Sequence, residues 1–247
     1  MKLVLEKAGV FQKSIDAIAV LIDEAEFIVD ERGLSLKATD PSQISMIDFM
    51  LEKKSFKEFD VGEKTKIGLD LDYLRQVMSR AKPDDELALE LDETKSRLNV
   101  SFKGASSRKF NIPLIDISSA ELPNPKIEFD AEVRLLASVL QDALKDASLV
   151  SSHVSIGVED DRFVVKADSS KGNLDSVTEK DKKNLIELDA KQNAMSMFPL
   201  DYLQDMLKTA QGNAEIEVKL KGSAPIQVAY GIGDARITYF LAPRIES

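Results

Sequence analysis

The chain contains 247 residues, of which 43% are hydrophobic, which is enough apolar sequence for the cores of two average domains. Lysine and arginine total 33 against 43 aspartates and glutamates, so the formal charge of −10 excludes a nucleic-acid-binding surface that covers the whole molecule. The lack of cysteine excludes disulfides and thiolate sites, and the lack of any run near the roughly 20 apolar residues of a membrane span or of a signal-peptide pattern predicts a soluble, cytoplasmic protein.

The first half of the chain shows two kinds of hydrophobic spacing. Helical intervals separate Phe11, Ile15, Ile18 and Ile22, and later Leu74, Val77, Met78 and Ala81. Residues 27–36, 86–91 and 97–102 alternate instead between apolar and polar, which predicts half-exposed antiparallel strands. Turn residues interrupt these patterns at positions 31–33 and 82–85.

The second half begins after an extended segment, residues 114–125, that contains two prolines. Two further helical stripes follow, the third from Leu136, Leu140, Ala143, Leu144 and Ala147, and the fourth from Leu203, Met206, Leu207 and Ala210. Residues 215–221 alternate as a strand, and Asp160-Asp161 predicts a turn.

An internal repeat relates the two halves. Leu71-Asp72-Tyr73-Leu74 recurs as Leu200-Asp201-Tyr202-Leu203, an offset of 129 residues, and the same offset carries Phe110 onto Tyr239. The repeat predicts an α+β fold of two similar domains, each with two helices backed by antiparallel sheet. We place the domains at residues 1–113 and 127–247, joined by an interdomain connecting loop at residues 114–126.

Few residues have the spacing that chemistry requires. The segment Gly231-Ile232-Gly233 lacks the third glycine of a dinucleotide fingerprint and precedes a strand-like run, so we interpret it as a hairpin turn. His153 has no second histidine or cysteine as a partner, and the acidic residues lie at predicted turns and strand ends. We therefore expect no catalytic residue, no metal site and no cofactor, and a protein that is not an enzyme.

Three segments resemble the DNA sliding clamps of the proliferating cell nuclear antigen family, especially the archaeal branch. The most specific is Tyr239-Phe-Leu-Ala-Pro-Arg-Ile-Glu246, and Asp40-Pro-Ser-Gln-Ile-Ser-Met-Ile47 and Leu114-Ile-Asp-Ile117 are similar to two further family segments. The resemblance covers essentially the whole chain. It implies the DNA clamp fold, in which three subunits join head to tail into a pseudo-sixfold ring around duplex DNA.

The resemblance also implies a function without catalysis. The ring would act as a polymerase processivity factor, with basic helix residues that contact phosphates without reading bases. The DNA-facing candidates are Lys13, Arg75, Arg80, Lys145 and Lys208. Gln12, Ala19 and Asp142 stand where clamps often carry basic residues, so we expect a weakly positive opening.

Two more sets of site residues follow from the resemblance. A hydrophobic pocket near the connecting loop would bind partner peptides through Ile44, Ile117, Leu122, Pro225, Phe240, Ala242, Pro243 and Ile245. The subunit interface would be formed by edge strands that contain Lys109, Phe110, Ile112, Leu174 and Ser176. The implied partners are duplex DNA, DNA polymerase, the clamp loader, flap endonuclease, DNA ligase and two further copies of the chain, with no membrane.

Two alternatives stay open from the sequence. The chain would be one subunit of a heterotrimeric clamp if its ring needs different partner chains. It would be an interaction scaffold that does not bind DNA if its acidic charge reflects its whole surface. For a clamp, we expect a cytoplasmic location at the nucleoid of a cell without a nucleus.

Overall fold

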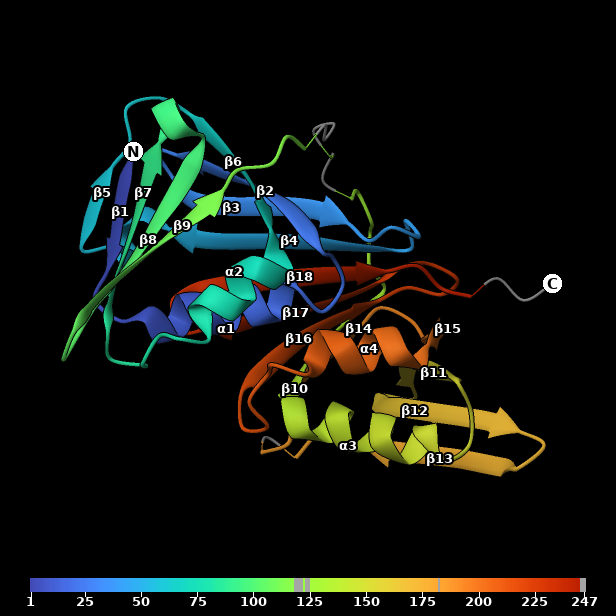
Figure 1. Ribbon diagram of the computed structural model, residues 1–247. Coiled ribbons are helices and arrows are strands. Elements are labelled where there is room, and N and C mark those ends of the chain that lie inside the picture. The colour runs from blue at the N-terminus through green and yellow to red at the C-terminus, as the bar shows by residue number, and fades with distance from the viewer. Residues whose placement is uncertain (118–121, 123–124, 182, 245–247) are drawn as a thin grey trace. The chain divides into compact units, whose positions relative to one another are not determined.

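The computed structural model describes residues 1–117, 122, 125–181 and 183–244, and the chain divides into two compact units (Figure 1). The first unit comprises Met1–Pro41, Ile47–Pro123 and Ile232–Ile237. The second comprises Ser42–Met46, Asn124–Gly231 and Thr238–Ser247. Short segments are thus exchanged between the halves of the sequence, which the predicted boundaries did not include.

The first half of the chain contains β1 (Lys2–Leu5), α1 (Ala8–Ile18), β2 (Glu24–Asp30), β3 (Gly33–Thr39), β4 (Ser45–Glu52), the 3-10 turn η1 (Lys53–Ser55), β5 (Glu58–Asp60), β6 (Thr65–Asp70), α2 (Leu71–Met78), β7 (Glu86–Asp92), the 3-10 turn η2 (Glu93–Lys95), β8 (Arg97–Lys103) and β9 (Ser107–Pro113). One sheet has the order β5-β1-β7-β8-β9, and β4-β3-β2-β6 are neighbours in another. The strand β9 therefore lies at a sheet edge.

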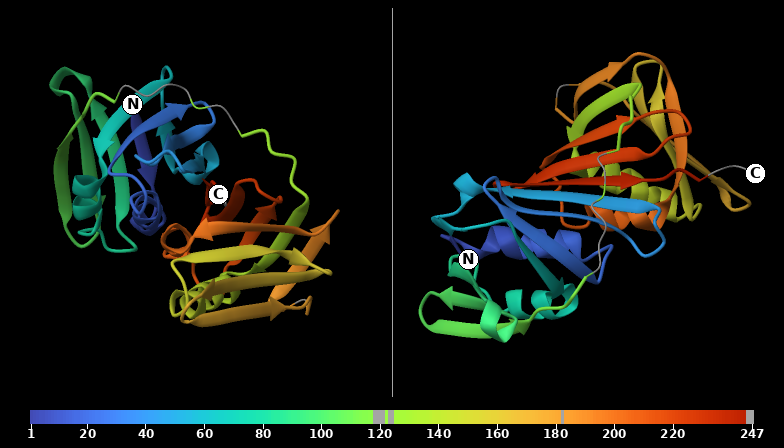
Figure 2. Two further views of the ribbon diagram at one scale, coloured as in Figure 1. Left: turned by 90° about the vertical axis from the view of Figure 1, so that its right-hand side faces the viewer. Right: turned by 90° about the horizontal axis from the view of Figure 1, so that it is seen from above.

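The second half contains β10 (Ala131–Leu136), α3 (Ala137–Ser148), β11 (His153–Glu159), β12 (Arg162–Ser169), β13 (Gly172–Thr178), β14 (Leu185–Ala190), β15 (Ala194–Pro199), α4 (Leu200–Leu207), β16 (Glu215–Leu220), β17 (Ile226–Ile232) and β18 (Ala235–Leu241). Its strands are ordered β13-β12-β11-β15 in one sheet, and β14-β10-β16-β17-β18 are neighbours in another. The strand β13 also lies at an edge. The predicted α+β architecture with two helices in each domain is confirmed (Figure 2).

The offset of 129 residues between the two copies also relates the bounds of their helices and strands. The offset carries both ends of β2 onto β11, of β6 onto β15, of α2 onto α4 and of β8 onto β17. The helices also pair in the same way, since α1 contacts α2 and α3 contacts α4. Each of these elements in one copy therefore has a structural counterpart in the other.

The helices bury the predicted apolar stripes but are shorter than the stripes. Ile22, Ala81 and Ala210 follow the helix ends, and Leu136 belongs to β10, so the sequence pattern overestimated the helices at these positions. At Ala81 the backbone N–H donates to the Met78 carbonyl at 3.0 Å, a three-residue spacing that tightens and closes the helix. The side chains of Ile22 and Ala210 remain buried without being helical, because the core continues beyond the helix.

The predicted turns are confirmed. Asp160 and Asp161 both have positive φ, 49° and 59°, as a two-residue hairpin between β11 and β12 requires. Gly233 has φ of 58° in the turn between β17 and β18, and the residues around it form a hairpin and no nucleotide loop.

Candidate functional site

The basic residues of the first helix pair are exposed. Lys13 lies on α1, Arg75 on α2, and Arg80 follows the end of α2. Arg75 Nε lies 3.4 Å from Asp16 Oδ1 of α1, and Arg75 Nη1 lies 3.9 Å from Asp72 Oδ1. Because the side chains of Arg75, Asp16 and Asp72 are 43%, 43% and 70% exposed, the ion pairs are weak and leave Arg75 accessible to a solvent anion.

The second helix pair is joined differently. The side-chain amide of Gln141 on α3 donates to the carbonyls of Leu207 and Ala210 at 2.9 and 3.0 Å, which links α3 to the end of α4. Lys145 Nζ lies 2.9 Å from Asp142 Oδ1 one turn earlier on α3. Lys208, at the C-terminal cap of α4, is exposed. All five predicted DNA-facing cations are thus at the surface of their own unit.

Most of the predicted pocket residues lie in the second unit. Ile44, Pro225, Phe240, Ala242 and Pro243 are all half-buried there. The Ala242 N–H donates to the Ile44 carbonyl at 2.8 Å, so the end of β18 lies beside the residues that precede β4. This contact brings two of the predicted pocket segments together.

The remaining pocket residues are assigned elsewhere. Ile117 and Leu122 belong to the first unit and are half-buried, and Ile245 lies outside the described residues. The connecting segment starts with a fixed contact, because the Ile115 N–H donates to the Gly68 carbonyl of β6 at 3.0 Å. A Cβ at Gly68 would come within 2.1 Å of the Ile115 carbonyl oxygen, so only glycine permits this approach.

The predicted interface residues lie on the two edge strands. On β9, Lys109 is exposed and Phe110 half-buried, while on β13 Leu174 and Ser176 are half-buried. Ile112 differs from this pattern, since its side chain is 0% exposed and belongs to the core of the first unit. The Ile112 side chain is therefore not available for an edge contact.

The hydrogen-bond alternation along β9 also excludes the backbone N–H of Ile112 from the free edge. The Leu114 N–H donates to the Ser96 carbonyl at 3.0 Å, and the register pairs Ile112 with Leu98. Because bonded and non-bonded pairs alternate in an antiparallel ladder, Ile112 donates toward β8. Lys109 and Asn111 therefore carry the N–H groups that point to the open edge.

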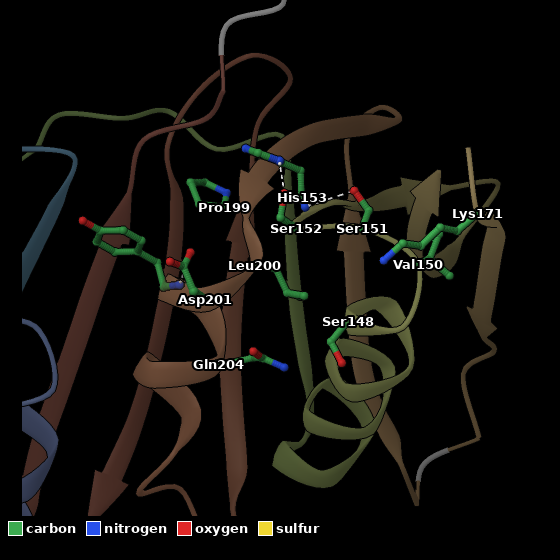
Figure 3. A pocket seen from close by; sticks show the side chains of 11 residues that line it. Ser148, Val150, Ser151, Ser152, His153, Lys171, Pro199, Leu200, Asp201 and Gln204 are labelled. Carbon is green, nitrogen blue, oxygen red and sulfur yellow. Dashed lines mark hydrogen bonds between the residues drawn. The ribbon is translucent and has the colours of Figure 1, made fainter. Parts of the chain in front are cut away.

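A surface cavity of about 700 Å³ lies where α3 ends and α4 begins (Figure 3). His153, at the start of β11, lies on its wall with Nδ1 3.1 Å from Ser152 Oγ and 3.2 Å from Arg244 Nη1. The cavity is lined mainly by hydroxyls, Lys171 and the first turn of α4. No acid, base and nucleophile on its wall form a connected catalytic arrangement.

Comparison with known proteins identifies the fold of both halves. The family model "Proliferating cell nuclear antigen, N-terminal domain" matches residues 1–121, and the corresponding C-terminal model matches residues 124–245. The chain belongs to the proliferating cell nuclear antigen family. These two matches meet within the connecting segment that the sequence placed at residues 114–126.

Several curated relatives of the chain are archaeal. The "DNA polymerase sliding clamp" of Methanococcus maripaludis strain C6 is 36% identical over 244 residues, with 96% of each chain covered. That of Thermofilum pendens is 35% identical over 248 residues, with 100% of each chain covered. Among solved structures, the proliferating cell nuclear antigen of Thermococcus kodakaraensis has a TM-score of 0.94 at 26% identity, over 98% of this chain and 99% of that one.

A second solved structure of the family contains a partner. The A. fulgidus protein bound to the C-terminal region of FEN-1 has a TM-score of 0.88 at 27% identity, over 100% of this chain and 99% of that one. The FEN-1 segment is bound to the A. fulgidus protein in that structure. Its presence is a reason to test whether the present chain also binds peptides.

An ion pair that the sequence did not reveal anchors the edge strand. Asp85, only 3% exposed, pairs with Arg108 at the start of β9 and also accepts a hydrogen bond from the Lys82 N–H at 3.0 Å. A Cβ at Gly104 would lie 2.0 Å from Asp85 Oδ1, so the β8–β9 turn is shaped around this carboxylate. Asp85 looked like an ordinary turn residue, because spacing alone does not indicate its burial.

Neither a metal cluster nor a membrane-spanning helix is present in the described part of the chain. No group of three or more histidines, aspartates or glutamates in residues 1–117, 122, 125–181 and 183–244 is arranged to hold a metal ion. Over the same ranges, no helix is both long and apolar enough to cross a membrane.

Proposed function

We propose that this chain is a DNA sliding clamp, three copies of which form a ring that encircles duplex DNA and holds replication and repair enzymes on it. One observation carries the assembly: β9 and β13 are both terminal strands of their sheets, and their counterparts in the repeat are β18 and the start of β4. Exposed strand edges are a liability in a monomer, and a head-to-tail ring pairs β9 of each copy with β13 of the next.

The repeat supplies the pairing. In the second unit, Ala242 at the end of β18 bonds to Ile44 beside β4. The offset of 129 residues carries β9 onto β18, and it carries Ile44 and the first residues of β4 onto β13. The pairing of β9 with β13 of a neighbouring copy would therefore repeat this strand arrangement. The counterpart of Ala242 is Pro113, which has no N–H, so Lys109 and Asn111 would supply the donors across the interface. The predicted interface residues Lys109, Phe110, Leu174 and Ser176 lie on these strands.

Duplex DNA is the proposed occupant of the ring. Lys13, Arg75, Arg80, Lys145 and Lys208 are exposed cations on or beside helices, and cations of this kind attract phosphates at any sequence. A clamp must slide, so contacts that do not read bases suit its function. Encirclement retains the ring without tight binding, which is compatible with the overall charge of −10.

Partner recruitment is proposed for the apolar residues Ile44, Ile117, Leu122, Pro225, Phe240, Ala242, Pro243 and Ile245. The bound FEN-1 segment of the A. fulgidus relative supports a peptide site in this family. We extend the proposal to DNA polymerase, the clamp loader, flap endonuclease and DNA ligase. In this role the chain is a non-catalytic platform that works at the nucleoid.

The deciding experiment combines mass and activity. Light scattering on the purified chain should give about three times 27.3 kDa, and the loaded ring should increase the length of DNA that a cognate polymerase makes in one binding event. A monomer that forms a ring only with other clamp chains supports the heterotrimer instead. A protein that neither binds DNA nor stimulates synthesis alone or with such chains is a scaffold, and the proposal fails.

The ring interface is tested through Lys109, whose N–H points to the open edge of β9. Lys109→Pro removes that donor without breaking the bonds between β9 and β8, so folded monomers are expected. Lys109→Ala retains the donor and should remain trimeric. A trimeric proline variant means that the assigned edge is wrong.

A further inference from the structure

We propose that the phosphate contacts of the ring are made mainly by the first helix pair, α1 and α2, and that α3 and α4 contribute little. The inference rests on the proposed clamp function and specifies where DNA lies within the opening. The six helix pairs of the ring would then alternate between attracting and weakly repelling DNA. The pseudo-sixfold ring would be only threefold in its electrostatic behaviour.

The second helix of each pair carries the clearest difference. Residues 71–80, LDYLRQVMSR, correspond to residues 200–209, LDYLQDMLKT, and the helices they form have identical relative bounds. Arg75 corresponds to Gln204, and Gln76 corresponds to Asp205. The first segment therefore has two arginines and one aspartate, whereas the second has one lysine and two aspartates.

The first helix of each pair does not compensate for this difference. Lys13 and Asp16 of α1 correspond to Asp142 and Lys145 of α3, so the two charges exchange places with no net change. The helix α3 carries an additional exposed carboxylate, Asp146. Its counterpart on α1 is the uncharged and buried Ala17.

The contacts of the cations point in the same direction. Arg75 is shared between two exposed carboxylates at 3.4 and 3.9 Å, and such solvated pairs exchange readily for phosphate. Among the described residues, Lys13, Arg80 and also Lys208 have no carboxylate within 4.0 Å. On α3, Lys145 lies 2.9 Å from Asp142 on its own helix, and Asp205 lies one turn before Lys208 on α4. DNA that approaches α3 and α4 meets more carboxylates than cations.

The repeat provides matched variants, because most of the substitutions install the residue found at the counterpart position. Arg75→Gln with Gln76→Asp gives α2 the charges of α4 and lowers the charge by two. In the second unit, Lys145→Gln with Lys208→Ser also lowers the charge by two. Serine is chosen because Ser79 stands at the position that corresponds to Lys208. All four positions are exposed or partly exposed, so folding and assembly should be unchanged, which circular dichroism and light scattering check.

The measurement is the affinity of each ring for a short fluorescent duplex by anisotropy, across a series of salt concentrations. We expect the α2 variant to bind about tenfold more weakly at low salt and its salt slope to fall by about one for each phosphate that the ring no longer binds. The α3–α4 variant should lose less affinity, about twofold, because carboxylates outnumber Lys145 and Lys208 on their own helices. Equal losses in both variants, or a larger loss in the α3–α4 variant, overturn the inference.

The wild type separates this inference from the clamp proposal. If the wild-type ring stimulates a polymerase but the two variants lose affinity equally, the clamp function stands and the charge asymmetry is wrong. If the wild-type ring neither binds duplex at low salt nor stimulates synthesis, the function itself has failed and the asymmetry fails with it.

Discussion

Phe110 and Tyr239 occupy the same position in the two copies of the repeat, yet Tyr239 is 0% exposed and Phe110 is only half-buried. The Tyr239 hydroxyl lies 3.4 Å from that of Tyr230, which donates to the Met206 carbonyl at 2.8 Å. Burial raises the pKa of both phenols, so they remain protonated as donors. The aromatic ring at this position is therefore fully buried in the second copy, whereas in the first copy it is partly exposed.

The proposed ring covers that aromatic ring. Phe110→Ala should weaken each subunit contact, because burying one phenylalanine contributes roughly 1.5 to 3 kcal/mol. We expect the trimer to dissociate at about tenfold to hundredfold higher concentration, measured by light scattering over a dilution series. Tyr239→Phe is the control, since it should cost about 1 kcal/mol of folding stability and leave assembly intact. Unchanged dissociation of Phe110→Ala removes this side chain from the interface.

The buried Asp85 gives a stability prediction. Asp85→Ala leaves the Arg108 guanidinium without its carboxylate and frees the β8–β9 turn, so we expect a loss of about 3 kcal/mol in the free energy of unfolding. Asp84→Ala is the matched control, because Asp84 is 84% exposed and pairs with an exposed Lys7. Urea unfolding of both variants decides the matter. Equal stability of the two variants means that the Asp85 pair is not structural.

The architecture could be predicted from the sequence because the same pattern of helices and strands occurs in both halves of the chain. Two helices and alternating strands recur at one offset, and tertiary packing changed only the helix ends, as at Ala81. It failed where the outcome depends on three-dimensional contacts. The burial of Asp85 and of the Ile112 side chain is set by neighbouring strands. The direction of a backbone N–H also depends on the register with β8, which no residue pattern on β9 encodes.

Asp181 gives a prediction about pH. Its carboxylate accepts backbone N–H bonds from Asn184, Lys183 and Leu185 at 2.7, 2.9 and 3.1 Å, and these bonds lower its pKa to about 2. A folded-state pKa below the usual 3.8 means that the stabilisation is fully present above that value and is lost as pH falls through about 2. NMR titration of the side chain should show this midpoint. Asp181→Asn should remove the corresponding acid-limb dependence of stability, and a midpoint near 3.8 in the wild type would contradict the assignment.

The partner pocket yields the prediction closest to function. Leu122 and Phe240 are half-buried apolar residues, one from the connecting segment and one from β18, and both are proposed to contact a bound peptide. Truncating such a side chain removes roughly 1.5 to 3 kcal/mol of apolar burial. Leu122→Ala with Phe240→Ala should therefore weaken a clamp-binding peptide at least about tenfold to hundredfold by calorimetry, while the ring stays assembled.

A control variant separates this effect from a general loss of apolar surface. Leu149, at the end of α3, is 77% exposed and lies outside the proposed pocket, so Leu149→Ala should bind the peptide as the wild type does. Assembly must survive in both variants, because neither changes β9 or β13. Wild-type peptide affinity in the Leu122, Phe240 variant would place the pocket elsewhere. Loss of the trimer in that variant would instead show that these residues support the fold, since the peptide site and the ring interface are separate surfaces in this proposal.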